Sequence, residues 1–329
     1  MKKRLLKLMA LVMASVFVLA GTVFAASEGK IDLPCTGANN SYADMHQEFL
    51  DKLSEYTDGR FTGTMYPGGQ MGTEDETFQG TIMGTYKVNC VSTAAHNNFA
   101  KASNYFNIPF LFTNVDDVLA KLDELKDAMQ ADYEAVGVHL LAFNINGFRQ
   151  LTSNKEINSF DALKGLKIRT MDTPIQIKIW TDLGTNPTPI NFSELYLALQ
   201  QGTVDAEENP LSTIFFVNLF EQQKYVYLTN HMMQFNAFTV NLDFWNELSP
   251  EDQEAFEKAA TEACATMNEA IAHDDEMYIA AFEEAGVTVS NVTEDFITAC
   301  REATADVKEE VAGTMDAEVF AALEVICAK

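Results

Sequence analysis

The stretch NGFRQLTSNKEINSFDALKGLKIRT, residues 146–170, holds two of the five arginines of this 329-residue chain. These are Arg149 and Arg169, and each follows an apolar residue at what reads as the end of a β-strand. The chain carries 22 Lys and Arg against 48 Asp and Glu, a formal net charge of −26. An arginine fork matches a carboxylate with two parallel charge-assisted hydrogen bonds. The spacing alone leaves two interpretations open: a ligand site for an anion, or ion pairs with the protein's own carboxylates.

Strand-like and helix-like segments alternate on both sides of this stretch. Apolar runs and alternation predict strands at 30–37, 60–66, 86–92, 138–146, 166–170, 203–208, 224–230 and 237–248. Helical spacing of apolar residues predicts helices at 41–59, 73–84, 173–184 and 193–202, and a long helix that follows a connector in 108–137. Segments of these lengths in this order predict an α/β fold with a mostly parallel sheet and helices on its faces.

The segment 249–286 predicts one further helix of well over twenty residues. Ser249 is placed as its N-cap and Pro250 at its first helical position, with acidic residues in the first turn. A helix of that length in an α/β protein is long enough to bridge two lobes. Without its leader the chain has about 300 residues, which favours two lobes or one large domain.

Residues 1–25 have the pattern of a cleavable secretory signal. A basic start (Lys2, Lys3, Arg4) precedes an apolar run, and a small-residue motif ends at Ala25. The run is shorter than the roughly 20 residues that a membrane span needs. We therefore expect cleavage near Ala25 and export across the inner membrane, and an uncleaved N-terminal anchor is the alternative. The acidity argues against nucleic acid and anionic lipid as partners.

The remaining chemistry-bearing residues form no recognisable catalytic or metal-binding set. The five cysteines could form one bridge between Cys35 and Cys90 and one between Cys300 and Cys327, or could all be buried free thiols. The five histidines are scattered without ligand spacing, and no phosphate-binding glycine loop or nucleophile elbow is present. The carboxylates that remain as candidates for acid–base or metal chemistry are Asp205, Glu207 and Glu208.

The run GFRQLTSNKEINSFDALKGLKIRT, followed by LGTNPTPINFSELYLALQQGTVDAEENP, closely resembles the substrate-binding proteins of tripartite ATP-independent periplasmic (TRAP) transporters, the DctP family. The segments MYPGGQMGTEDE, NIPFLFTN, KYVYLTNH and NELSPEDQEAF resemble the same family in the same order. The resemblance implies a two-lobed periplasmic binding protein fold, with hinge strands and a long helix that spans both lobes. We place lobe I at 26–146 with 235–274, and lobe II at 147–234 with 275–329.

The resemblance also implies roles for individual residues. Arg169 is expected to form a bidentate pair with a substrate carboxylate, and Arg149 and Asn209 to contact the same group. Phe192 is expected to line the pocket. The carboxylates at 205–208 would then flank a binding loop and would not be catalytic.

The chain also departs from the family pattern. The family often has Gly at the position of Ala206 and Gln at the position of Glu207. Sialic acid binders carry a glutamate and an arginine around the positions of Ser92 and Ala95, and the absence of both here argues against sialic acid as the ligand. Further candidates for the pocket are Asp172, which could accept hydrogen bonds from substrate hydroxyls or an amine or be partnered within the protein, and the weaker candidates Ser92, Glu74 and Asn39.

Together these observations predict a monomeric periplasmic protein that captures a small organic acid and delivers it to a TRAP permease. We expect no catalysis, no cofactor and no metal. An ABC-type or sensor-linked binding protein and a secreted enzyme remain alternatives. Four aromatic residues could shape the pocket, although core packing is the default expectation for them: Phe148, Trp180, Phe192 and Phe215.

Overall fold

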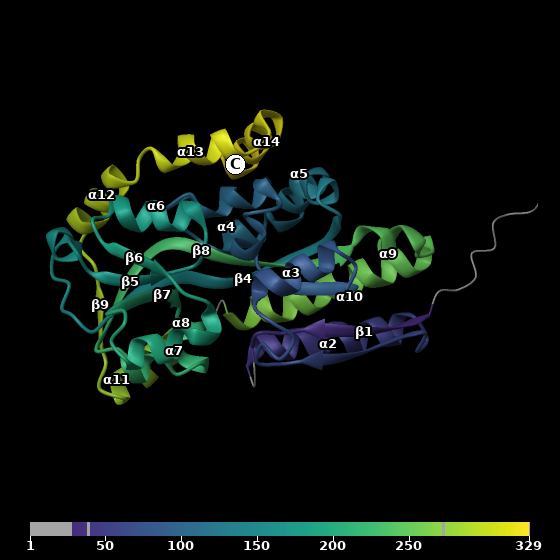
Figure 1. Ribbon diagram of the computed structural model, residues 1–329, viewed down its shortest axis with the longest axis horizontal. Coiled ribbons are helices and arrows are strands. Elements are labelled where there is room, and N and C mark those ends of the chain that lie inside the picture. The colour runs from purple at the N-terminus through teal and green to yellow at the C-terminus, as the bar shows by residue number, and fades with distance from the viewer. Residues whose placement is uncertain (1–27, 38–39, 272–273, 329) are drawn as a thin grey trace, which may run out of the picture.

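The protein is elongated, and the long strands β4 and β8 of its main sheet run through the middle of the molecule (Figure 1). A computed structural model describes residues 28–37, 40–271 and 274–328. The main sheet has seven strands in the order β3-β8-β4-β7-β5-β6, and β9 pairs with β8 outside this path. Its strands are β3 (Val88–Ser92), β4 (Val138–Ser153), β5 (Lys167–Thr170), β6 (Asn186–Pro189), β7 (Ala206–Pro210), β8 (Tyr225–Asn241) and β9 (Thr288–Asn291).

Two long antiparallel strands, β4 and β8, connect the lobes. They pair from Val138 opposite Asn241 to Ser153 opposite Tyr225. The lobe I half of β8 also pairs with β3, whereas the lobe II half of β4 also pairs with β7. The pairing register shifts beside Gly147, whose φ of 96° lies in a region that side chains with a Cβ rarely adopt. A glycine at this point therefore lets the strand cross from one lobe to the other.

Lobe I packs its helices against β3 and the adjoining halves of β4 and β8. A separate two-stranded parallel sheet, β1 (Gly29–Pro34) and β2 (Phe61–Tyr66), lies beside α2 (Ser41–Tyr56). Helix α2 buries an apolar stripe at helical spacing and packs on α10. The other helices here are α3 (Glu74–Ile82), η1 (Thr93–His96), η2 (Lys101–Asn107), α4 (Val115–Leu119), α5 (Leu122–Ala135), α9 (Leu242–Glu247) and α10 (Pro250–Ile271).

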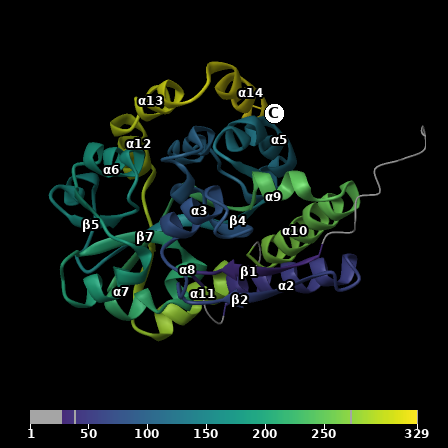
Figure 2. The ribbon, with the colours of Figure 1, turned by 45° about the vertical axis from the view of Figure 1, so that its right-hand side comes forward.

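Lobe II contains the parallel strands β5, β6 and β7 with helices around them (Figure 2). These helices are η3 (Phe160–Leu163), α6 (Pro174–Asp182), α7 (Phe192–Gln200), α8 (Leu211–Phe216), η4 (Leu219–Gln222), α11 (Asp275–Glu284) and α12 (Glu294–Ala303). The chain then returns towards lobe I, where α13 (Val307–Thr314) contacts α6 and η2, and α14 (Ala317–Cys327) packs on α5. The exact lobe boundaries stay a prediction.

The structure corrects three sequence-based expectations. The sheet is mixed, because its long central pairs β3–β8, β8–β4 and β4–β7 are antiparallel. The segments 225–230 and 237–241 belong to the single strand β8, which ends at Asn241, and α9 begins at Leu242. Arg149 lies within β4 rather than after its end.

The prediction of one long helix over 249–286 is confirmed at its start, but the segment forms two helices, α10 with 22 residues and the separate α11. Ser249 caps α10 by accepting a hydrogen bond from the backbone N–H of Asp252 at 3.1 Å, and Pro250 is the first helical residue. Helix α10 ends at Ile271, and α11 begins at Asp275. All five cysteines are free. The predicted signal peptide and Asn39 lie outside the described residues, among which no helix is long and apolar enough to cross a membrane.

Candidate functional site

A cavity of about 400 Å³, called the outer cavity below, lies between the lobes. It shares lining residues with a smaller cavity of about 80 Å³, called the recess. From lobe I it is lined by the turn before α3 and the start of that helix. From lobe II it is lined by the β5–α6 loop and the start of α7. Asp172 lines the outer cavity, and the recess brings together six predicted residues: Glu74, Ser92, Arg149, Arg169, Phe192 and Asn209. Residues far apart in the sequence therefore meet in one place.

Arg169 is a buried cation that forms no ion pair with any carboxylate in the described part of the chain. It stands near the end of β5 and is 3% exposed, and its Nε donates to the Ile190 carbonyl at 2.9 Å. No carboxylate oxygen of the described residues lies within 4.0 Å of its guanidinium nitrogens. Burial and the nearby positive charge of Arg149 lower the pKa of Arg169 to about 10. An anion in the recess would relieve both costs.

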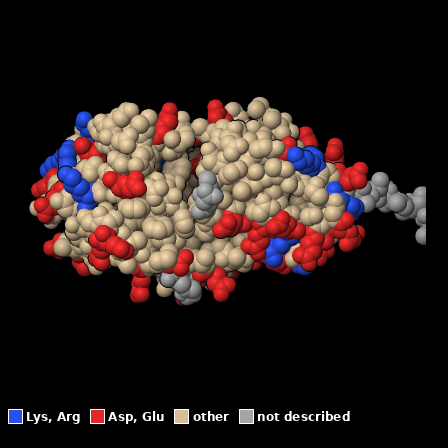
Figure 3. All heavy atoms as spheres, turned by 90° about the horizontal axis from the view of Figure 1, so that it is seen from below, with Lys and Arg blue, Asp and Glu red and all other residues tan. Residues whose placement is uncertain are grey.

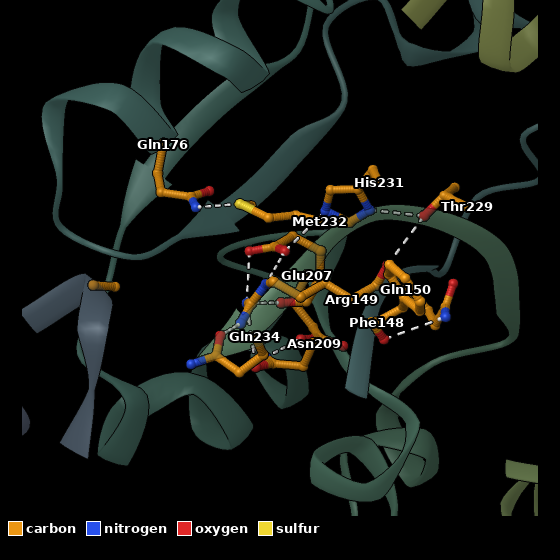
Figure 4. A network of polar contacts seen from close by, with 12 residues as sticks. Phe148, Arg149, Gln150, Gln176, Glu207, Asn209, Thr229, His231, Met232 and Gln234 are labelled. Carbon is orange, nitrogen blue, oxygen red and sulfur yellow. Dashed lines mark hydrogen bonds and ion pairs between the residues drawn. The ribbon is translucent and has the colours of Figure 1, made fainter. Parts of the chain in front are cut away.

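Arg149, by contrast, already has an acidic partner within the protein and lies in a network of polar contacts (Figure 4). Its Nε and Nη2 form an ion pair with both carboxylate oxygens of Glu208, with Nη2 to Oε1 at 2.8 Å, and Nη1 donates to Gln234 Oε1. His231 Nε2 contacts the same carboxylate at 3.1 Å. Burial acts to raise the pKa of Glu208, but Arg149 and His231 together lower it to about 2. The positive charge of Arg149 is therefore largely neutralised before any ligand enters.

Asn209 connects this ion pair to a second buried glutamate. Its Oδ1 accepts from Arg149 Nη2 at 3.3 Å, and its Nδ2 donates to Glu207 Oε2 at 2.6 Å. Both glutamates are fully buried on β7. Burial raises the pKa of Glu207 to about 7, although hydrogen bonds from Asn209 and Thr152 act in the other direction. Asn209 lines the recess, whereas Glu207 does not line it and contacts Asn209 from the protein side.

Acidic side chains form the opposite wall of the outer cavity. Glu74 and Asp75 open α3, whose N-cap Thr73 forms a reciprocal capping box with Glu76. Burial, and then Asp75, raises the pKa of Glu74, and burial, and then Asp172 from lobe II, raises the pKa of Asp75. The one cation that lines this outer cavity among the described residues is Arg169.

Gln234 and Asn236 are amides of the recess that the sequence did not predict. Both lie on β8, two residues apart and therefore on one face of a buried strand. Gln234 Nε2 donates to Ser92 Oγ at 2.8 Å, whereas Asn236 Nδ2 is a buried donor without a partner in the described structure. Amides that alternate with the apolar residues Met233, Phe235 and Ala237 are the signal that could have identified them.

Of the four aromatic residues that could shape the pocket, the structure places one at the cavities. Phe192 lines both cavities, whereas Phe148 and Phe215 line neither and Trp180 is a core residue, 2% exposed. The carboxylates at 205–208 are not arranged as a metal site, and no group of three or more metal-ligating side chains occurs within 28–37, 40–271 and 274–328.

Comparisons with known proteins place these features in a family. Residues 36–314 match the family described as bacterial extracellular solute-binding protein, family 7, or DctP. The chain is 33% identical over 248 residues to the 2,3-diketo-L-gulonate-binding periplasmic protein YiaO of Escherichia coli, covering 74% of this chain and 75% of that one.

Two solved structures share its fold. The sugar acid binding protein DctPAm of Advenella mimigardefordensis, in complex with galactonate, has a TM-score of 0.85 at 26% identity. A TRAP periplasmic solute binding protein from Polaromonas, bound to D-erythronate, has a TM-score of 0.85 at 28% identity, and each comparison covers 92% of this chain and 99% of the other. The chain therefore belongs to the DctP family of TRAP periplasmic solute-binding proteins, which bind their solutes without transforming them.

Proposed function

We propose that this protein captures a small organic acid between its lobes by pairing the ligand carboxylate with Arg169. It then delivers the acid to the membrane subunits of a TRAP permease. The observation that carries the proposal is the buried guanidinium of Arg169, which lines both the outer cavity and the recess and has no ion-pair partner among the described residues. Asn209, Phe192 and Asn236 complete the surroundings of the carboxylate. Closure of the lobes about β4 and β8 would then bury the ligand.

The charge distribution narrows the class of acid. Arg149 is neutralised by Glu208, which leaves one uncompensated cation among the described residues of the site. The outer wall presents Glu74, Asp75 and Asp172. A second carboxylate on the ligand would meet these acidic groups in a partly desolvated cleft, where like charges repel strongly. We therefore propose a monocarboxylate whose far end carries hydroxyl or other hydrogen-bond donors.

Similar proteins support this class. The structural neighbours quoted above hold galactonate and D-erythronate, which are monocarboxylates with several hydroxyl groups. An acidic wall suits such ligands because carboxylate oxygens accept hydrogen bonds from hydroxyls.

A thermal-shift screen of the purified mature protein against small acids, sugars and amino acids tests the proposal. A ligand at a hundredfold excess over its Kd adds about 2.7 kcal/mol to the free energy of unfolding. We expect shifts confined to carboxylates, with hydroxylated monocarboxylates such as galactonate ranking above the dicarboxylate of the same chain length, galactarate.

Two results would count against the account in different ways. Shifts caused by neutral sugars or by cations would overturn the carboxylate assignment itself. Equal shifts for galactarate and galactonate would leave Arg169 in place and remove the argument from the acidic wall. The alditol galactitol is the matched neutral control, since it retains the carbon chain and hydroxyls and lacks a carboxylate.

A further inference from the structure

If Glu207 is ionised, the side-chain contacts around it outnumber the protons available to form hydrogen bonds in them. Thr152 Oγ1 lies 2.8 Å from Glu207 Oε1 and 2.9 Å from Gln223 Oε1. A threonine hydroxyl has a single proton to donate. With an ionised Glu207, Thr152 would therefore stand between two side-chain acceptors, besides the more distant Glu207 carbonyl at 3.4 Å, and could satisfy only one of them fully.

The orientations of the two neighbouring amides are fixed by their other partners. Gln223 Nε2 donates to the Gln222 carbonyl at 2.7 Å, which can only accept, so Gln223 must turn Oε1 towards Thr152. Asn209 Oδ1 faces Arg149, which can only donate, so Asn209 must turn Nδ2 towards Glu207 Oε2. Flipping either amide therefore cannot supply the missing proton, and Oε1 of Glu207 is the atom left to carry it.

We propose that Glu207 is a neutral carboxylic acid in the folded protein, with its proton on Oε1 donated to Thr152, and that it positions the amide of Asn209 without placing another negative charge behind the ligand carboxylate. Thr152 then donates to Gln223, and each of the three contacts has one donor and one acceptor. Glu207 is a positioning residue, because it acts on the recess through Asn209 and does not line it.

The charges around Glu207 act in both directions, and burial is the largest single influence on its protonation. On its own strand, Glu208 opposes a second negative charge, whereas Arg149 from β4 favours one and is already paired with Glu208. Arg169, from the neighbouring strand β5, also favours a charged Glu207, and it has no ion-pair partner among the described residues. The segment after η4 contributes the neutral Gln223. The raised pKa of Glu207, about 7, has burial as its main cause and supports the geometric argument.

The direct test is the titration of the Glu207 carboxyl group in the unliganded protein. Its side-chain carbon can be assigned through its own backbone amide by carbon-13 nuclear magnetic resonance, so the result does not depend on a variant. We expect a midpoint near 7 instead of the ordinary value of 4.5. A midpoint near 4.5 would overturn the proposal.

A second test uses stability. A carboxyl group that keeps its proton when folded and loses it above pH 4.5 when unfolded makes the folded state less stable as the pH rises from 4.5 to about 7. Glu207→Gln should flatten this part of the stability curve, because the amide replaces the protonated acid in shape and in donor position. Glu247→Gln, at an exposed glutamate of α9, is the matched control and should keep the wild-type slope. An unchanged slope in Glu207→Gln would contradict the proposal.

The consequence for binding rests on the proposed function, whereas the protonation itself does not. Ionisation of Glu207 above pH 7 should weaken the binding of an anion at Arg169 by on the order of fivefold, the scale of a coulombic coupling between partly shielded charges. If no carboxylate binds, the midpoint near 7 is still expected. If the midpoint is ordinary, carboxylate binding at Arg169 is unaffected, so failure of the two ideas is distinguishable.

Discussion

Arg169→Ala is expected to weaken binding of the organic acid by on the order of a hundredfold or more. The substitution removes the planar fork that supplies two charge-assisted hydrogen bonds, each contributing about 1.5–3 kcal/mol. It also leaves a ligand carboxylate facing Glu74 and Asp172 with no uncompensated cation among the residues that line the outer cavity. Titration calorimetry with the carboxylate that gives the largest thermal shift measures the loss.

Two further variants sharpen this result. Arg169→Lys should also bind poorly, because a lysine keeps the charge but loses the bidentate geometry. Arg301→Ala is the matched control, since Arg301 is exposed on α12 and stacks on Phe110 away from the cavity, and it should bind as the wild type does. Wild-type affinity in Arg169→Ala would remove the central assignment.

Arg149→Met should have its largest effect on stability. Glu208 is fully buried and would be left as an uncompensated negative charge with His231 as its remaining partner. Breaking a buried ion pair by removal of one partner costs about 3–5 kcal/mol in free energy of unfolding. Methionine retains most of the apolar stem, so the loss reports the ion pair more than the packing.

Equilibrium urea unfolding compares this variant with Arg169→Met at the same pH. We expect Arg169→Met to be destabilised far less, because Arg169 has no ion pair to lose and its buried charge is itself a cost. Equal losses in the two variants would contradict the division between a structural Arg149 and a ligand-binding Arg169. In the sequence these arginines look alike, and it is the structure that shows Glu208 beside Arg149.

The parts of the fold that the sequence predicts are those set by local pattern. The apolar run of β4, the stripe of α2 and the Ser249–Pro250 start of α10 each depend on residues close together in the chain. The resemblance added the positions of Arg169, Asn209 and Phe192, and the structure places all three at one cavity.

The parts that were missed depend on contacts between distant residues. The sequence predicts two strands where the structure has the single strand β8, in which Asn230 is an irregularity with a left-handed φ of 44°. Gln150 holds this irregularity in the sheet, since its Nε2 donates to Asn230 Oδ1 at 2.6 Å and its Oε1 accepts from the Asn230 N–H at 3.0 Å. The partner of Arg149, the second amide face on β8 and the antiparallel pairing of β4 likewise have no local signature in the sequence.

The measurement that tests the central claim most directly is a structure of the protein with its strongest carboxylate ligand bound. The account predicts that both oxygens of the ligand carboxylate lie about 2.7–2.9 Å from guanidinium nitrogens of Arg169, the range of charge-assisted hydrogen bonds. It also predicts that Arg149 remains paired with Glu208. A ligand whose carboxylate is held by other groups, with no contact to Arg169, would contradict the account.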